Sequence, residues 1–273
     1  MDSDRYIMKI DINAFDPDVT FDCGQCFRWD KIDEGIWKGI ALGRSLEVKK
    51  DGDWLCISGA EKAMESKLRK YFDLDRDYKP VLEALSADPV LKKAIKFAPG
   101  IRILRQEPWE TLCSFIISQN NNIPRIKGIV SRLCENFGDK IGENEYSFPE
   151  ASRLAPLNEE DLAPLRSGFR ARYILDAARR VVSGEIDFDA LTYIPLADAR
   201  KILMKIKGVG PKVADCVLLF GCGRLDAFPI DVWVKRVLAR FYPDGFPEEF
   251  AKYGGIAQQF LFHYARCCPD SGF

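Results

Sequence analysis

The chain has 273 residues, 47% of them hydrophobic and 30% charged, which is typical of a globular protein with about two domains. No apolar run approaches the ~18 residues that a membrane-spanning helix needs. The first ten residues lack the basic and apolar regions of a secretory signal. The nine cysteines are irregularly spaced, unlike a disulfide framework, so a reducing cytoplasm fits best.

Histidine and net charge narrow the classes of function. The single histidine, His263, excludes most Ser–His and Cys–His nucleophile pairs and most His-rich metal sites. Any catalysis is therefore expected to use Lys, Asp or Glu. The net charge is −1, but residues 1–60 carry eight basic and twelve acidic residues, whereas residues 195–240 carry nine and four. Random variation among solvated charges and an anion-binding face on the later segment are both open explanations.

Short segments rich in β-branched and aromatic residues fill the first third of the chain, between Gly and Asp turn signals. The sequence KKDGDW at 49–54 is typical of a hairpin turn. From about residue 60 the apolar residues recur every three or four positions, which predicts helices. The expected strands are 5–12, 19–30, 35–50 and 53–59, and the expected helices that follow are 61–72, 78–88 and 90–98.

The rest of the chain predicts a succession of helices. One of them opens with Pro124 and ends at Gly138, and another begins at the N-cap Asn158 with acidic residues in its first turn. The fold class is therefore α+β, with an N-terminal antiparallel β-sheet domain with helices (1–107) and an all-helical part (108–273). The expected helices are 108–119, 124–138, 158–165, 170–182, 196–206, 211–221 and 231–242.

The stretch KGVGPKVADC, residues 207–216, places two glycines just before a lysine. A nucleotide-binding P-loop is excluded because the glycine spacing is wrong and a helix precedes the stretch. Helix, glycine turn and helix form instead a helix-hairpin-helix pattern over 196–221, in which Gly208 and Gly210 let the main chain approach closely. Free N–H groups at the second helix's N-terminus would bind a DNA phosphate. An ordinary tight turn between helices is the open alternative.

Lys212 and Asp231 are the candidate catalytic pair. A helix of about 15 Å and a loop that can span about 30 Å allow the chain to bring Asp231 back to the helix end that holds Lys212. A neutral lysine amine is a nucleophile, and a carboxylate can accept a proton and stabilise a cationic sugar. The plainer alternatives are a solvated lysine and an aspartate that only caps a helix.

With GVG, PK, VADC and PIDV nineteen residues after the lysine, the chain resembles the helix-hairpin-helix DNA glycosylases with a Gly/Pro…Asp loop. Four further stretches, CGQCFRW, SFIISQNNNIPRI, SGFRARYI and YGGIAQQFLF, make it similar to the 8-oxoguanine DNA glycosylase/AP lyases over most of its length. The resemblance implies that Lys212 attacks C1′ to form a Schiff base and that Asp231 assists base departure. β-Elimination would follow, so the implied activity is bifunctional base excision repair of 8-oxoguanine.

The resemblance also implies a pocket for a flipped base. The Gly24 carbonyl would read the N7–H that distinguishes 8-oxoguanine from guanine. Cys216 and Phe262 would sandwich the base, and Gln258 would bond its Watson–Crick edge. From the residues alone, Phe262 would be a core aromatic and Cys216 a small buried hydrophobe.

Other residues would contact the DNA by the same resemblance. Asn120 would be the wedge that fills the vacated stack, and Arg125 and Arg170 would bond the estranged cytosine. Phe169 stands where animal members have Tyr, and Trp233 where they have His, so both departures put strictness for the opposite base in doubt. Without the resemblance, the asparagines are a helix end and the arginines are solvated. The phosphate contacts are assigned to Gly208, Gly210 and Val213.

The cysteine pair of CGQC does not indicate a metal or redox site. A zinc site would need a second pair, which the adjacent Cys267 and Cys268 do not supply, and a redox motif would precede a helix. The same adjacency predicts no iron–sulfur cluster. No other cofactor is expected, although main-chain carbonyls of the hairpin could hold K⁺ or Na⁺. The alternatives are a glycosylase for another oxidised or alkylated base, and a non-catalytic DNA-binding module.

The expected partner is double-stranded DNA containing oxidised guanine. The protein is expected to act as a monomer and not to associate with a membrane. If the source is bacterial, the protein is expected to be cytoplasmic and associated with the nucleoid when on DNA.

Overall fold

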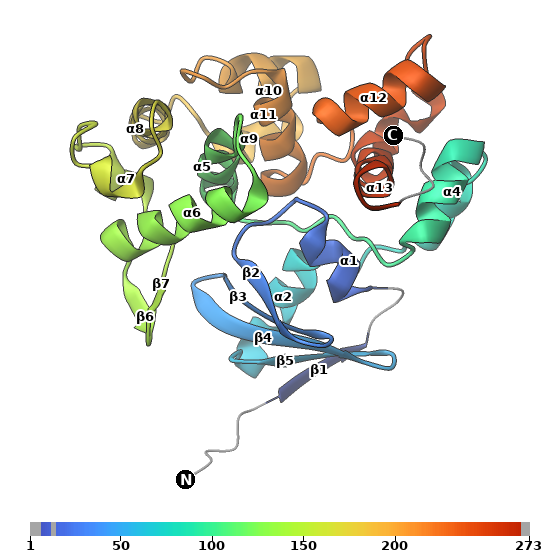
Figure 1. The fold of residues 1–273 in the computed structure, drawn as a ribbon, viewed down its shortest axis with the longest axis horizontal. Coiled ribbons are helices and arrows are strands. Elements are labelled where there is room, and N and C mark those ends of the chain that lie inside the picture. The colour runs from blue at the N-terminus through green and yellow to red at the C-terminus, as the bar shows by residue number, and fades with distance from the viewer. Residues whose placement is uncertain (1–6, 12–14, 269–273) are drawn as a thin grey trace.

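A computed structural model describes residues 7–11 and 15–268 (Figure 1). Near the N-terminus lies one antiparallel sheet with the strand order β1-β5-β4-β3-β2. The hairpin expected at 49–54 joins β4 to β5, with Asp51 opposite Trp54 and Gly52 at φ +58°. The strands are β1 (Ile7–Asp11), β2 (Trp29–Asp33), β3 (Ile36–Ala41), β4 (Arg44–Asp51) and β5 (Trp54–Ser58). Residues 5, 6 and 12 of the first expected strand lie outside the described residues.

The expected strand at 19–30 is wrong over most of its length. Its first part belongs to helix α1 (Pro17–Asp22), and only its last two residues enter β2. Asp16 caps this helix by accepting a bond from the Asp18 N–H at 2.9 Å, and Pro17 occupies the first turn. Capping and the burial of Phe21 outweigh the β-propensity of this stretch.

Helices make up most of the remaining chain, as expected for the α+β class. The predicted helix at 170–182 coincides with α8, while the short elements α7, α9, β6 and β7 were not expected. The long helix α13 was also not predicted, although its sequence was noted. The bounds are α2 (Glu65–Tyr71), α3 (Lys79–Leu85), α4 (Pro89–Phe97), α5 (Pro108–Ser118), α6 (Ile123–Phe137), β6 (Lys140–Gly142), β7 (Glu145–Tyr146), α7 (Ala151–Leu154), α8 (Arg170–Val182), α9 (Phe188–Tyr193), α10 (Leu196–Leu203), α11 (Pro211–Cys216), α12 (Val232–Phe241) and α13 (Gly254–Cys267).

The α-helix expected at 158–165 is wrong. Its first residues form turns, and only Ala163–Leu165 make a short 3-10 helix. Asn158 and Asp161 do bond each other reciprocally, each side chain accepting from the other's main-chain N–H. This capping arrangement closes one turn, but Pro164 removes a hydrogen-bond donor from the next one.

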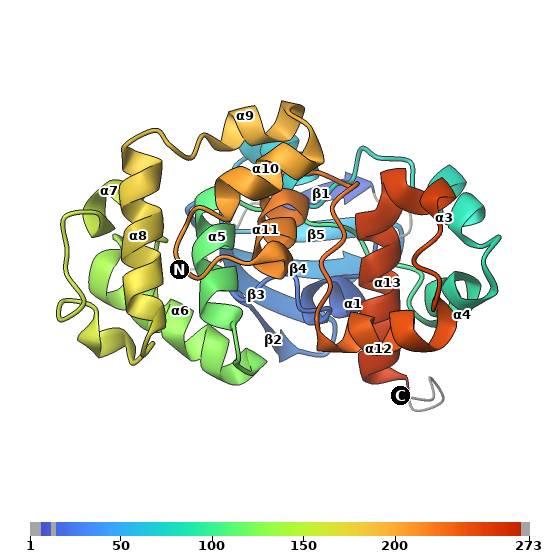
Figure 2. The ribbon, with the colours of Figure 1, turned by 90° about the horizontal axis from the view of Figure 1, so that it is seen from above.

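Two hydrophobic cores hold the molecule together. One fills the space between the sheet and the helices α1 and α2, and the other unites α3 and α4 with the helices from α5 to α13. Seen from above, α5, α11 and α13 lie over the sheet (Figure 2). The Cys23–Phe27 segment connects the two cores, because Cys26 belongs to the first and Phe27 to the second. The boundary at residue 107 stays a prediction.

No helix within the described residues has the length and apolar character needed to cross a membrane.

Candidate active site

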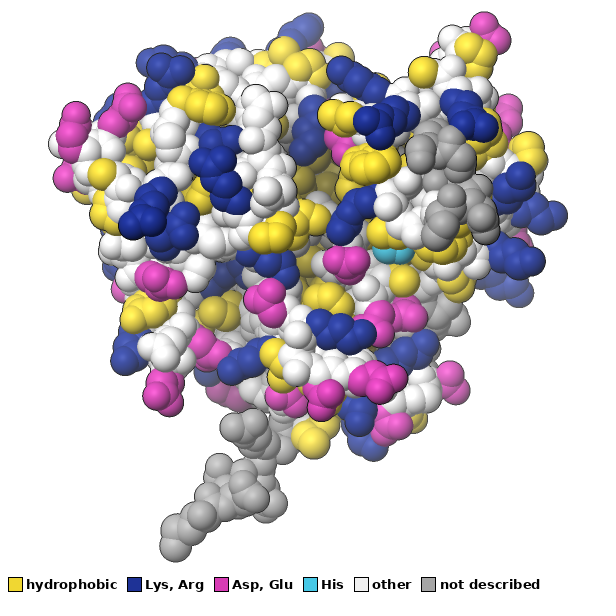
Figure 3. Space-filling view, viewed as in Figure 1, with side chains coloured by type: hydrophobic (Ala, Val, Ile, Leu, Met, Phe, Trp, Pro, Cys, Tyr) yellow, Lys and Arg dark blue, Asp and Glu magenta, His cyan; other side chains and the backbone are white. Residues whose placement is uncertain are grey.

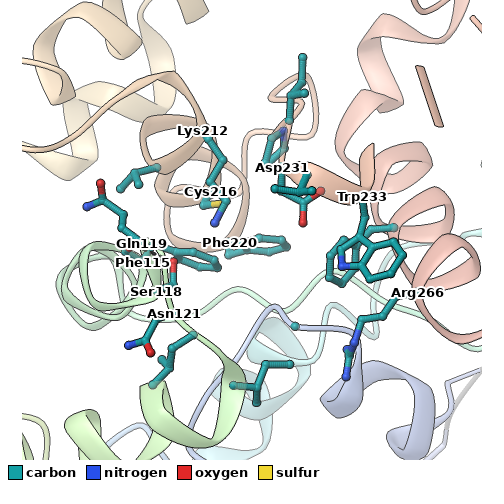
Figure 4. Close-up of a pocket in the computed structure, with 18 of the residues that line it drawn as sticks. Phe115, Ser118, Gln119, Asn121, Lys212, Cys216, Phe220, Asp231, Trp233 and Arg266 are labelled. Carbon is teal, nitrogen blue, oxygen red and sulfur yellow. Dashed lines mark hydrogen bonds between the residues drawn. The ribbon is translucent and has the colours of Figure 1, made fainter. Parts of the chain in front are cut away.

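A cavity of about 820 Å³ opens between α5, α11, the start of α12, α13 and the segment that follows α1 (Figure 4). Its size suits a small organic ligand. On the face shown in Figure 3, Lys and Arg side chains surround the hollow between the helices, whereas Asp and Glu side chains crowd the lower half, over the sheet. Acidic and basic side chains are therefore unevenly distributed on this face.

Lys212 lies in the first turn of α11, with its side chain in the cavity. Its Nζ is 4.8 Å from the centre of the Phe115 ring, and Phe115 stacks on Phe220 at 5.5 Å. An ammonium group over a ring face is attracted by the ring's quadrupole. The two aromatic rings therefore form an apolar wall beside the lysine, which sequence reasoning did not identify.

Asp231 lies at the start of α12 and lines the same cavity as Lys212 (Figure 4). Its Oδ1 accepts a bond from the Val234 N–H at 2.8 Å, so it caps the helix. The chain between the two helices therefore does return, and the capping alternative describes the same residue. The cap fixes one carboxylate oxygen and directs the group toward the cavity.

Three of the proposed base-contacting side chains gather around this cavity. Cys216 is buried one turn after Lys212, and burial raises the pKa of its thiol to about 11, so it presents a neutral, weakly polar surface. Gln258 is only 4% exposed, and its Oε1 has no hydrogen-bond partner among the described residues. A buried acceptor without a partner is costly, which indicates a place for a ligand donor. Phe262 lines the same cavity.

Gly24 lines the cavity directly beside the Phe262 ring. Its φ is +74°, and a Cβ at this position would lie 3.1 Å from the Phe262 ring. Glycine is therefore required both by the backbone conformation and by the close approach of the ring.

The proposed wedge and opposite-base residues lie at one side of the cavity. Asn120 follows the end of α5 at φ +47° and is exposed. Arg125 is exposed near the start of α6. Arg170 is only 3% exposed, and its guanidinium donates to the carbonyls of Gln119 and Asn120, so it braces the turn that presents Asn120. Phe169 is 44% exposed, with its ring 4.6 Å from the Arg170 guanidinium.

The glycine turn has the conformation that the hairpin pattern requires. Gly208 has φ +77°, and a Cβ there would lie 2.3 Å from the Tyr173 ring, whereas a Cβ on Gly210 would meet nothing within 4 Å. The first main-chain N–H of α11 with a helical partner is that of Ala214, which bonds the Gly210 carbonyl. Among the described residues, the N–H groups of Lys212 and Val213 have no acceptor, as expected of an anion-binding helix N-terminus. The Val213 side chain is buried, so only its main chain can contact a phosphate.

Several cavity residues were missed or only noted as departures. Trp233 lines the cavity with its ring 4.9 Å from the Arg236 guanidinium, and Arg266 lies at the cavity's edge. Gln259 points from α13 to the segment around Gly24. The sequence carries no signal for Gln259 or Arg266, because their partners lie more than 200 residues away along the chain.

The cysteines of CGQC follow α1 and are both buried, and burial raises the pKa of Cys23 to about 12. Within the described ranges, no three His, Cys, Asp or Glu side chains are grouped as a metal site. The expected absence of an iron–sulfur cluster and the cation at the hairpin both stay predictions.

Comparison with known proteins assigns the chain to a class. Residues 113–249 match the family model of the HhH-GPD superfamily of base excision DNA repair proteins, and residues 7–112 match the model of the 8-oxoguanine DNA glycosylase N-terminal domain. The chain therefore belongs to the HhH-GPD superfamily of base excision DNA repair proteins, and its N-terminal part is of the 8-oxoguanine DNA glycosylase type.

Two of its relatives by sequence are named N-glycosylase/DNA lyase or probable N-glycosylase/DNA lyase. The Saccharomyces cerevisiae protein of that name is 41% identical over 249 residues, which are 80% of this chain and 66% of the yeast protein. A probable N-glycosylase/DNA lyase from Methanothermobacter thermautotrophicus is 30% identical over 95% of this chain and 96% of its own length.

Two solved structures share the fold over nearly the whole chain. MBOgg1, in complex with a low-affinity DNA ligand, has a TM-score of 0.91 and 45% identity over 97% of both chains. The Clostridium acetobutylicum 8-oxoguanine glycosylase/lyase, in complex with double-stranded DNA containing cytosine opposite 8-oxoG, has a TM-score of 0.88 and 39% identity over 97% of this chain and 99% of its own. These matches confirm the predicted α+β fold and the family.

Proposed function

We propose that this chain is a bifunctional DNA glycosylase/AP lyase that excises 8-oxoguanine from double-stranded DNA in base excision repair. The observation that carries the proposal is the joint presence of Lys212 and Asp231 on one cavity, directly beside a helix N-terminus whose first N–H groups find no acceptor in the described part of the chain. A phosphate bound there holds the damaged strand, so the flipped nucleotide enters the cavity with its sugar near the lysine.

The chemistry follows from these two side chains. Lys212 Nζ first gives up a proton to solvent, and the resulting amine attacks C1′. The bond from C1′ to the base nitrogen breaks, and the base leaves with the bonding electrons and takes up the proton that Nζ releases on forming its new bond. The Asp231 carboxylate stabilises the positive charge that develops on the sugar. The C1′–ring oxygen bond then opens, the ring oxygen takes up a proton from solvent, and a C1′=N iminium remains. Loss of a C2′ proton expels the 3′ phosphate by β-elimination, which cuts the strand.

Recognition of the base uses the opposite walls of the cavity. The Gly24 carbonyl accepts a bond from the N7–H of 8-oxoguanine, a donor that guanine lacks. Gln258, whose Oε1 has no partner among the described residues, bonds the Watson–Crick edge. Cys216 and Phe262 enclose the faces of the base. A wrong base leaves these buried polar groups without partners, which costs more than a lost contact alone.

Residues at the rim of the cavity contact the rest of the DNA, including the opposite strand. Asn120 fills the space of the flipped base, and the exposed Arg125 contacts the estranged cytosine together with Arg170 and Phe169. Main-chain groups of Gly208, Gly210 and Val213 bind the DNA backbone. The enzyme acts as a monomer and without a redox or metal cofactor, apart from K⁺ or Na⁺ at the hairpin. In a bacterial source it works in the cytoplasm, associated with the nucleoid.

The test is to trap the imine. The protein is incubated with duplex DNA containing 8-oxoguanine opposite cytosine and is then treated with borohydride. A covalent protein–DNA adduct is expected for the wild type, with none for Lys212→Gln. Lys207→Gln removes an exposed lysine of the same hairpin and should keep the adduct. Intact DNA binding without any adduct would refute the lyase mechanism and leave a DNA-binding module. Repetition with each opposite base measures the preference for cytosine.

A further inference from the structure

Cys23 and Gly24 line the cavity, and side chains from distant parts of the chain hold the main-chain carbonyls of the segment Asp22–Gln25. Three of its four carbonyls accept such a bond. The donors come from α13 and from the strand-like segment before α5. The pairs are Arg266 Nη1 to the Asp22 carbonyl at 2.8 Å, Gln259 Nε2 to the Cys23 carbonyl, and Gln106 Nε2 to the Gln25 carbonyl at 2.6 Å.

The carbonyl of Gly24 is the exception. No hydrogen bond to it occurs within the described residues, although its neighbours on both sides are held. The side chain of Gln25 is completely buried and anchors its own residue, since its amide oxygen accepts from the Leu104 N–H at 2.8 Å. The segment is therefore fixed around one carbonyl that keeps its acceptor capacity.

Glycine makes such fixing necessary. Each peptide unit is planar, so the direction of the Gly24 carbonyl depends on the dihedral angles that join the two flanking units. Gly24 itself adopts many combinations of these angles at little cost. The bond from Gln259 holds the Cys23–Gly24 unit, and the bond from Gln106 holds the residue after Gly24. Together they remove the freedom that the glycine would otherwise have.

Gln259 is an unusual residue for its place. It is only 2% exposed and lies within the core side of α13, where an apolar side chain would be expected. Burying an amide is unfavourable unless it finds a partner. Its neighbour Gln258 turns to the cavity, so adjacent glutamines of one helix reach the ligand space and the segment that borders it.

We propose that Gln259 is a positioning residue for base recognition, which holds the Cys23 peptide so that the Gly24 carbonyl faces the N7–H of the flipped base. This inference rests on the proposed function. Gln106 supports the other side of the glycine in the same way. The two hydrogen bonds from Gln259 and Gln106, called the clamp below, should affect only one step. They matter while a base is being recognised, and they are irrelevant for an abasic sugar, which has no base to contact.

The test compares two substrates of the same enzyme. Single-turnover rates are measured on duplexes with either 8-oxoguanine or an abasic site opposite cytosine. Gln259→Met keeps the length of the side chain and removes the donor. Because a displacement of about 1 Å at a reacting group costs about 100-fold, excision of 8-oxoguanine should fall by about 10- to 100-fold. Cleavage at the abasic site should stay within about twofold of the wild type. Asn136→Leu, which removes a similar amide-to-carbonyl bond at an exposed position of α6, should alter neither rate.

The outcomes separate this inference from the proposed function. Equal losses on both substrates, or no loss on 8-oxoguanine, would overturn the positioning role of Gln259. A wild type that cleaves abasic DNA but leaves 8-oxoguanine intact would overturn the proposed substrate, and with it the clamp. If Gln259→Met does not fold, Gln106→Met is measured instead, because that side chain is only partly buried, and it should show the same selective loss.

Discussion

The two hairpin glycines allow protein stability and DNA binding to be separated by equal substitutions. In Gly208→Ala, the new methyl group requires a positive φ, which costs about 1–2 kcal/mol, and it would lie 2.3 Å from the Tyr173 ring. We expect a loss of at least about 2 kcal/mol, which lowers Tm by roughly 4–8 °C for a chain of this size. DNA binding should weaken as well, because the turn must shift.

Gly210→Ala should behave differently. The residue has φ −98° and ψ −178°, which alanine adopts freely, and no atom lies within 4 Å of the new methyl group. Tm should therefore stay unchanged or rise slightly. The methyl group would, however, occupy the space through which a phosphate approaches the N–H groups of α11. Loss of one charge-assisted hydrogen bond, worth about 1.5–3 kcal/mol, would raise Kd by about 10- to 100-fold.

The assay is fluorescence anisotropy with a labelled duplex that carries an uncleavable abasic analogue, at one fixed salt concentration, because phosphate contacts depend strongly on salt. Thermal melts of the same preparations report stability. If Gly210→Ala binds the duplex as tightly as the wild type, the phosphate grip is misplaced. If it lowers Tm as much as Gly208→Ala, the structural distinction between the two glycines is wrong.

Substitutions at three further residues test the site and the stability of the fold. Asp231→Asn keeps an acceptor for the Val234 N–H, so Tm should be retained while the rate of excision falls by about 100-fold. Asp231→Ala loses that acceptor as well, so it should also lose about 1 kcal/mol of stability. Thermal melts and single-turnover rates compare the two substitutions. Arg125→Ala should lower excision opposite cytosine about 10-fold more than opposite adenine, and equal losses would remove Arg125 from opposite-base reading. Burial raises the pKa of Glu110 to about 7, although Arg28 lies 3.2 Å away, so the folded state keeps a proton that the unfolded state releases near pH 4.5. The free energy of unfolding should therefore fall as pH rises through about 7. In urea unfolding, the stability of Glu110→Gln relative to the wild type should rise from pH 5 to pH 8. A difference that does not change with pH would contradict the raised pKa.

Patterns that depend on neighbouring residues predicted much of this fold. The helix at 170–182 shows its period clearly, and the hairpin at 49–54 follows from its turn residues. The glycine turn and the return of Asp231 to the helix of Lys212 also follow from local spacing and chain length. The prediction was wrong where local signals compete. At 19–30 the β-propensity of the residues favoured a strand, but the cap at Asp16 and the burial of Phe21 stabilise a helix over the first part.

The parts of the site that escaped prediction depend on contacts between distant residues. Gln259 reaches Cys23 across 236 positions, and nothing in the helix that carries it indicates that partner. Arg170 was assigned to the estranged cytosine, yet its guanidinium also braces the carbonyls of Gln119 and Asn120. The ring of Tyr173 explains Gly208 only when α8 and the hairpin are packed together.

Identification of the amine that attacks the sugar tests the central claim most directly. The borohydride-trapped adduct with 8-oxoguanine DNA is digested with nuclease and protease, and the modified peptide is sequenced by mass spectrometry. The sugar remnant is expected on Nζ of Lys212 and on no other amine. Attachment to Lys207, to Lys235 at the cavity's edge or to the N-terminal amine would contradict it, as would turnover of 8-oxoguanine without any trapped adduct.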